Sequence, residues 1–232
     1  MRRTIFIFVA CGWLAAAAAG QMSAVAQVSS ESSSVAGSGR VQEVDGVAAR
    51  IEDDILTESE VRELGAFQLL VDGQAKPRAE RIRELADQWI VRGEATAANY
   101  PQPSIEDVNR AWTEFTAHFA SSEDFQKRRA AAQLSEPALR RLLAEQLYLS
   151  RFLDYRFRPT AQVEQKQIET YYQTELAPRL REGGLAVPGI ESVTDTIREV
   201  LVQRAISERA TQWLDDTRNR VKIDIVPEGD QP

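Results

Sequence analysis

The first periodic pattern in the chain is a short alternation of apolar and polar positions, the pattern of a half-buried strand. It lies in the stretch VDGVAARI, residues 44–51. The residues Glu52–Asp54 predict a turn, and Ile55–Leu56 predict a second short strand after it. The expected inward positions are Val47, Ala49 and Ile51, and the outward ones are Ala48 and Arg50. A two-stranded hairpin is only marginally stable in water, so this one needs a further partner.

Beyond the hairpin, apolar residues recur at helical spacing almost to the end of the chain. Thr57 and Glu60 fit a capping box, which predicts a helix that starts there and ends at Asp72–Gly73. Ser104, Ser122 and Ser135 are the expected N-caps of three later helices. The remaining predicted helices cover 77–93, a segment through Ile168–Leu176, and 190–220.

The helix that begins after Ser135 has the most apolar sequence, EPALRRLLAEQLYLSRFLDYRF. It carries two neighbouring apolar stripes, and a helix with two such faces is typical of the centre of a bundle. The first stripe is Leu139, Leu142, Leu143 and Leu147, and the second is Tyr148, Phe152 and Tyr155.

The second convincing strand signal lies near the other end of the chain, in VKIDIV, residues 221–226. There Val221, Ile223 and Ile225 alternate with charged residues. We expect this strand to pair with residues 44–51, because buried backbone groups need hydrogen-bond partners. The predicted fold class is mainly α: a helical bundle with a small sheet formed by an N-terminal hairpin and the C-terminal strand.

The first 26 residues have the pattern of a secretory signal peptide, with two arginines, an apolar core and an Ala-x-Ala cleavage site before Gln27. An uncleaved membrane anchor is the alternative, since the apolar run approaches spanning length. Residues 27–40 are rich in Ser and Gly and predict a flexible linker. The expected folded domain is then 41–232, with helices over 57–182 and a final helix and strand over 190–226.

Composition excludes several classes of function. The charged fraction of 27% and the hydrophobic fraction of 43% are those of an ordinary globular protein. The formal net charge of −7 becomes −9 if Arg2 and Arg3 leave with the signal peptide, which argues against general nucleic-acid binding. Cys11 and His118 are the single cysteine and histidine, so no thiolate or histidine zinc site is expected. No catalytic residue, metal or cofactor is predicted.

Five aromatic residues are the candidates for binding apolar polypeptide. They could line a groove, or they could belong to the core, as their helical spacing favours. They are Trp112, Phe115, Phe119, Tyr171 and Tyr172.

Three segments together resemble the SurA-like N-terminal region of periplasmic chaperones, over about four-fifths of the mature chain. The opening VDGVAARIEDDILTESEV is similar to the family's strand, turn and first helix. The segment RFRPTAQVEQKQIETYYQTEL is similar to its exit from the N-terminal region, and ISERATQWLDDTRNRVKIDI to its last helix and strand. Members of the family usually carry a parvulin-type prolyl isomerase domain before the last helix, whereas here only Gln173–Asp195 lies there.

The resemblance implies a periplasmic, ATP-independent chaperone whose partners are unfolded or nascent secreted polypeptides, outer-membrane protein precursors among them. A structural or assembly adaptor for one folded partner is the alternative. Isomerase activity is a weaker third candidate, because the isomerase domain and its histidines are missing. The oligomeric state stays open, and we expect no stable membrane insertion after signal cleavage.

Overall fold

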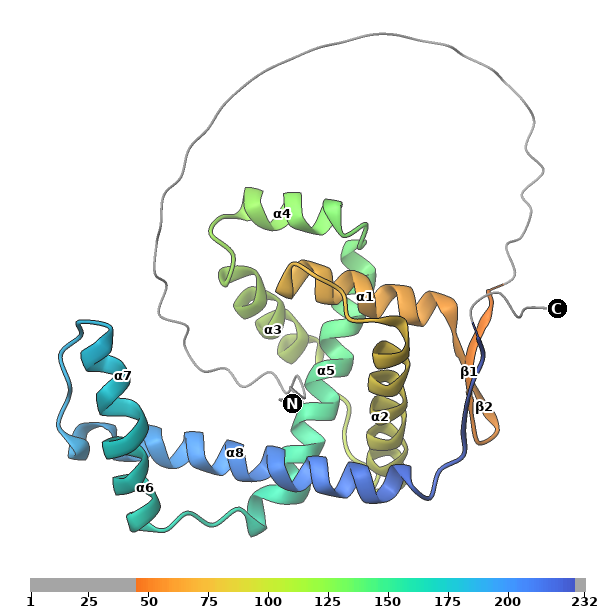
Figure 1. Cartoon of the computed structure of the whole chain (residues 1–232). Coiled ribbons are helices and arrows are strands. Elements are labelled where there is room, and N and C mark those ends of the chain that lie inside the picture. Colours follow the sequence, from red (N-terminus) through yellow and green to blue (C-terminus); the bar gives the residue numbers. More distant parts are fainter. Residues whose placement is uncertain (1–44, 228–232) are drawn as a thin grey trace, which may run out of the picture.

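The computed structural model describes residues 45–227. The signal peptide predicted at 1–26 and the linker predicted at 27–40 lie outside the described residues. The described chain is mainly helical with one small three-stranded sheet, which confirms the predicted fold class (Figure 1). The elements in chain order are β1 (Val47–Ile51), β2 (Asp54–Thr57), α1 (Glu58–Asp72), α2 (Arg78–Ala97), α3 (Ile105–Ala117), α4 (Ser122–Ala131), α5 (Glu136–Phe157), the 3-10 turn η1 (Arg158–Thr160), α6 (Gln165–Tyr171), the π-helical segment η2 (Tyr172–Leu176), α7 (Ala177–Glu182), α8 (Ile190–Arg218) and β3 (Ile223–Ile225).

The sheet joins the two ends of the described chain. Its order is β2-β1-β3, and β1 is antiparallel to both neighbours, so the predicted pairing of the N- and C-terminal strands is confirmed. Arg50 lies opposite Asp224, and Ile51 lies opposite Ile223. Two further backbone bonds extend the ladder: Glu52 N–H donates to the Lys222 carbonyl and Val226 N–H to the Ala48 carbonyl, each at 3.0 Å.

One expectation for β1 is wrong. Ala48 was expected on the outward face, but it is fully buried, and Val47 is partly exposed. The cause is a register shift between Val47 and Ala49, which face Thr57 and Leu56, so β1 has one residue more than β2 at this point. Such a β-bulge bends the strand and redirects the side chains on either side of it.

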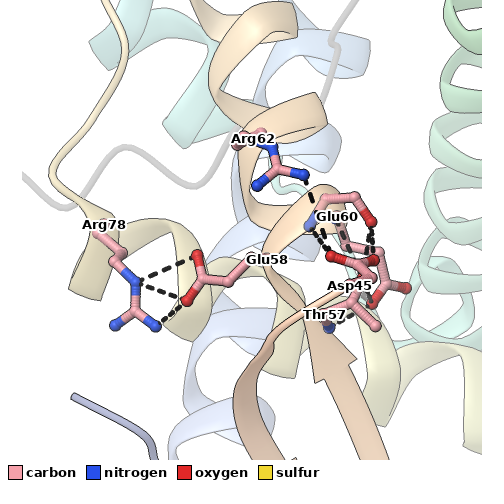
Figure 2. Close-up of polar contacts among 7 residues, drawn as sticks. Asp45, Thr57, Glu58, Glu60, Arg62 and Arg78 are labelled. Carbon is pink, nitrogen blue, oxygen red and sulfur yellow. Dashed lines mark hydrogen bonds and ion pairs between the residues drawn. The ribbon is translucent and has the colours of Figure 1, made fainter. Parts of the chain in front are cut away.

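The hairpin leads directly into α1 through the predicted capping box. Glu60 N–H donates to Thr57 Oγ1 at 3.3 Å, and Thr57 N–H donates to Glu60 Oε2 at 2.8 Å. Asp45 adds a second cap, since its carboxylate accepts bonds from the Ser59 N–H at 3.0 Å and from the Ser59 hydroxyl (Figure 2). These bonds from Ser59 hold the pKa of Asp45 below its ordinary value. Asp45, two residues before β1, is therefore attached to the start of α1.

The first turns of α1 and α2 are joined by an ion pair. Arg78 Nε donates to Glu58 Oε1 at 3.1 Å, and a terminal guanidinium nitrogen of Arg78 contacts the same carboxylate (Figure 2). Both side chains are more than four-fifths buried. This contact joins the start of α2 to the start of α1.

Two helix boundaries differ from those predicted. The N-cap of α4 is Ser121 and not Ser122: Ser121 Oγ accepts the Asp124 N–H at 3.1 Å. Serine is a favoured N-cap residue at either position, and it is Ser121 that has the extended backbone of a cap, with φ −159° and ψ 166°. The helix α2 continues past its expected end at Gly93 to Ala97, with Ala98 at its C-cap. A single glycine weakens a helix without ending it.

The helix α5 crosses the centre of the molecule, as its two apolar stripes predicted. It packs against α2, α3 and α8. Its C-terminal half contributes Tyr148 and Phe152 to a core shared with α2 and α8, and its N-terminal half contributes Leu139 to a core shared with α1, α3 and α4. A third core joins the sheet to α1 and α2.

The helix α8 extends beyond this bundle at its N-terminal end. There it packs on α6, and with α6, η2 and α7 it forms a part that projects from the rest of the molecule (Figure 1). We call residues 165–204 the arm. At its other end α8 leads to β3, and Val221, between the two, contacts both the central core and the core under the sheet.

Deleting Val221–Val226 should destabilise the whole domain and not only its end. The deletion removes a ladder partner of β1 and the packing of Val221 and Ile223. A loss of about 2–3 kcal/mol is expected from burial and hydrogen bonding, or about 5–10 °C in melting temperature. Thermal unfolding followed by circular dichroism measures it. The exposed Asp224→Ala is the control, and equal melting temperatures for the deletion and the intact chain would contradict the pairing's importance.

Candidate functional site

The arm contains a groove between α6, η2 and α8 with a volume of ≈ 310 Å³. Tyr171 of α6 and Leu201 of α8 supply most of its apolar lining. Lys166, Thr170 and Glu175 supply polar atoms at its edges. Pockets that bind small ligands or side chains have volumes of about 300–1,000 Å³, and their lining is mostly apolar with a few polar groups. This groove lies at the lower end of that range.

The groove depends on a local widening of the helix that carries Tyr171. In η2 the backbone follows a π-helix, and the Ala177 N–H donates to the Tyr172 carbonyl, five residues back. Pro178 follows and has no N–H for a normal helical bond. The wider turn accommodates the proline ring and turns Thr174 and Glu175 towards the groove. Single π-helical turns of this kind occur frequently at functional sites.

Arg204 of α8 holds Tyr171 and Glu175 together. Its guanidinium lies 5.2 Å from the centre of the Tyr171 ring and donates two bonds to the Glu175 carboxylate, at 2.9 and 3.1 Å. The hydrogen bonds from Arg204 hold the pKa of Glu175 below its ordinary value. The carboxylate at the edge of the groove is therefore charged at neutral pH and already paired.

Tyr171 and Tyr172, adjacent in sequence, have different environments. Tyr171 lines the groove, whereas the Tyr172 hydroxyl donates to the Pro188 carbonyl at 2.6 Å, in the loop before α8. Both rings are half-buried. Of the two tyrosines predicted to bind apolar polypeptide, Tyr171 is the one in the groove, and Tyr172 attaches the α7–α8 loop to η2.

The other three candidates lie together in a different part of the molecule. Trp112 and Phe115 of α3, with Phe119 in the turn just after that helix, surround Phe125 of α4, with ring centres 5.7, 6.3 and 5.1 Å from the Phe125 ring. We call these four residues the aromatic cluster. Phe115 is 6% exposed and belongs to the core, whereas Trp112 and Phe119 are half-buried. In this conformation Phe115 offers almost no surface to a partner.

The two half-buried rings of the aromatic cluster are each covered by an arginine. The Arg140 guanidinium lies 4.0 Å from the centre of the Trp112 ring, and that of Arg128 lies 5.8 Å from the Phe119 ring. A guanidinium over an aromatic face is stabilising and keeps the surface polar. Arg140 and Arg128 also pair with carboxylates on their own helices.

The sequence did not identify several residues of the groove and of the aromatic cluster. Leu201, Glu175 and Arg204 were not singled out for the groove, because helical spacing shows that they share a helix face but not which element they meet. Phe125 was not singled out either. As the one aromatic residue in a charged helix, it was a usable signal for a contact between α4 and other aromatic residues.

Arg158 joins α5 to α8 at the base of the arm. It donates two bonds to Asp154, both at 2.8 Å, and two to Glu199, at 3.0 and 2.7 Å. Gln203 donates to both carboxylates. The bonds from Arg158 lower the pKa of Glu199 from its ordinary 4.5 to about 2. These contacts fix the first half of α8, and with it one wall of the groove, relative to α5.

The remaining chemistry of residues 45–227 is sparse. The chain contains no cluster of histidine, cysteine, aspartate and glutamate in this range that could hold a metal ion. His118 caps the end of α3, with Nδ1 2.6 Å from the Glu114 carbonyl oxygen. None of the helices in the same range is both long and apolar enough to span a bilayer.

Comparison with known proteins adds no name to these features. The chain matches no protein-family model and no curated protein.

Glu199→Gln should weaken the domain at neutral pH and less so in acid. Because the pKa of Glu199 is lower in the folded state, its contribution is complete above pH 4.5 and disappears as the pH falls towards 2. The side chain is 54% exposed, so about 1 kcal/mol or less is expected at pH 7. Urea unfolding of both proteins at pH 7, 4 and 3 measures the difference. A constant difference across this range would contradict the assignment.

Proposed function

We propose that this protein is an exported, ATP-independent chaperone of the periplasm that holds unfolded polypeptides, with outer-membrane protein precursors among its clients. The observation that carries the proposal is the groove in the arm. It has an apolar lining from Tyr171 and Leu201, and it lies on a part of the molecule that projects from the bundle.

The size and lining of the groove suit weak binding of many sequences. A groove of ≈ 310 Å³ receives one or two apolar side chains and excludes a folded surface. The carboxylate at its edge is neutralised by Arg204, so a client needs no particular charge to enter. Apolar contact has little directional preference, which is what a protein that holds many unfolded chains requires.

Two further features support the same proposal. The chain resembles the SurA-like N-terminal region, in which the last strand returns to the first, and β3 pairs with β1 here. The formal net charge of −7 disfavours self-association while apolar surface is offered to clients.

The groove should be needed for holding activity. Tyr171→Ala combined with Leu201→Ala removes its apolar lining and should reduce suppression of aggregation at least threefold. Light scattering of a reduced, unfolded client protein, with the mature chain in several-fold excess, measures the effect. Tyr155→Ala is the matched control, because Tyr155 is 64% exposed on α5, outside the groove. If the intact chain failed to slow aggregation of any client tested, the proposal would be wrong.

Partner capture separates this proposal from the adaptor alternative. A tagged mature chain in a periplasmic extract should recover a broad set of unfolded polypeptides. One stoichiometric folded partner, retained by the groove variant, would favour the adaptor.

We expect no prolyl isomerase activity. Between η2 and α8 the chain has only α7 and a short loop, and its one histidine caps α3. A proline-peptide isomerisation assay should give the buffer rate at all protein concentrations. Saturable turnover by the purified chain would overturn this expectation.

A further inference from the structure

The helix α4 is held to the rest of the molecule by few contacts. Phe125 is its only buried residue, at 2% exposed. The ion pair between Arg128 and Asp124 joins two residues of α4 and does not link the helix to another element. The Arg128 guanidinium also lies over the ring of Phe119, in the turn that follows α3. Figure 1 shows α4 at the edge of the molecule, beyond α1 and α3.

Three aromatic rings pack around Phe125, within a core that also has aliphatic members such as Leu70 and Leu139, and we call the space that Phe125 fills between these rings the pocket. The rings of Trp112 and Phe115 are nearly perpendicular to it, at 85° and 83°, and the Phe119 ring is tilted at 59°. Edge-to-face packing of this kind favours an aromatic ring over an aliphatic side chain of similar size. The pocket is therefore matched to a phenylalanine ring, which the chain itself supplies.

The two ends of α4 differ in how firmly they are attached. At the C-terminal end Ala132 and Leu134 are buried, and Arg129 Nη1 donates to the Leu134 carbonyl at 2.9 Å. At the N-terminal end Phe125 is the anchor, preceded by the exposed Ser121 and Ser122. A rotation of α4 about Ala132–Leu134 would withdraw Phe125 from the pocket and leave the C-terminal attachment in place.

We propose that the pocket of Trp112, Phe115 and Phe119 is a second client site, specific for aromatic side chains of unfolded polypeptides, and that α4 closes it with Phe125 as an internal competitor. The proposal rests on the proposed holding function and adds a site outside the groove. A client aromatic ring replaces Phe125, and α4 moves aside. The burial of Phe115 is then a property of the closed state.

The internal competitor makes a distinctive prediction about affinity. Removing the Phe125 ring frees the pocket, so Phe125→Ala should bind an aromatic client at least fivefold more tightly than the intact sequence. Trp112→Ala removes a wall of the pocket and should weaken binding at least fivefold. The matched control is Lys127→Ala, an exposed residue of α4, which should leave the Kd unchanged.

The probe is a fluorescein-labelled 15-residue peptide of Gly, Ser and Lys with three Phe residues, and fluorescence anisotropy with the mature chain measures its Kd. A second peptide with Leu in place of each Phe tests the preference for aromatic rings and should bind at least threefold more weakly to Phe125→Ala. Equal affinities for the two peptides would overturn the aromatic specificity.

Hydrogen exchange tests the movement of α4 without any substitution, and so covers the case in which Phe125→Ala does not fold. Saturating Phe peptide should accelerate exchange of the amides of Ser122–Ala131 at least threefold and leave those of α5 unchanged. Unchanged or slower exchange in α4 would overturn the proposal.

The outcomes also separate this inference from the holding function. If the groove variant loses aggregation suppression while Trp112→Ala keeps its Kd and α4 exchange is unaffected, the chaperone proposal stands and the second site is wrong. If the intact chain suppresses aggregation but neither it nor Phe125→Ala binds the Phe peptide, the second site is likewise wrong.

Discussion

The backbone pairing of β1 with β3 is the constraint on which the rest of the structure depends. It joins residues 170 or more positions apart in sequence, from Glu52 with Lys222 to Ala48 with Val226. Closing a loop of that length costs about 4–5 kcal/mol of chain entropy, which three short ladder pairs cannot offset alone. The packing of the helices between the strands supplies the rest. The sheet and the bundle thus stabilise each other as parts of one cooperative unit.

The helix α8 connects this constraint to the groove. Its C-terminal end leads through Val221 into β3, and its N-terminal half carries Leu201 and Arg204. A rigid helix of 29 residues spans about 44 Å, so its direction is set at both ends. Arg218, paired with Asp87 of α2 at 2.6 Å, fixes it near the sheet, and Arg158 fixes it at the base of the arm. The wall of the groove is therefore positioned by contacts at both ends of one helix.

Much of the fold could be predicted from local pattern, and the sites could not. The capping box at Thr57 and the central position of α5 follow from capping chemistry and periodicity within single segments. The β1–β3 pairing follows from two strand signals that each need a hydrogen-bond partner. The bulge that buries Ala48 depends on how β1 meets β2, which no alternation in β1 alone reveals. The same holds for the π-helical turn before Pro178: a proline in a helical pattern predicts a disturbance, but not which carbonyl the next amide will reach.

The aromatic residues show most clearly what the sequence could not predict, namely how far each ring is buried. Helical spacing identified Trp112, Phe115, Phe119, Tyr171 and Tyr172 as members of apolar faces, and it could not decide between core and binding surface. The structure shows why that choice is too narrow. A guanidinium covers a half-buried ring in the groove, where Arg204 lies over Tyr171, and another in the aromatic cluster, where Arg140 lies over Trp112. A guanidinium over the face of a ring is stabilising and shields part of the ring from water. Aromatic rings and charged groups can therefore lie together at a partly exposed surface, and burial alone does not divide such residues into core and exterior.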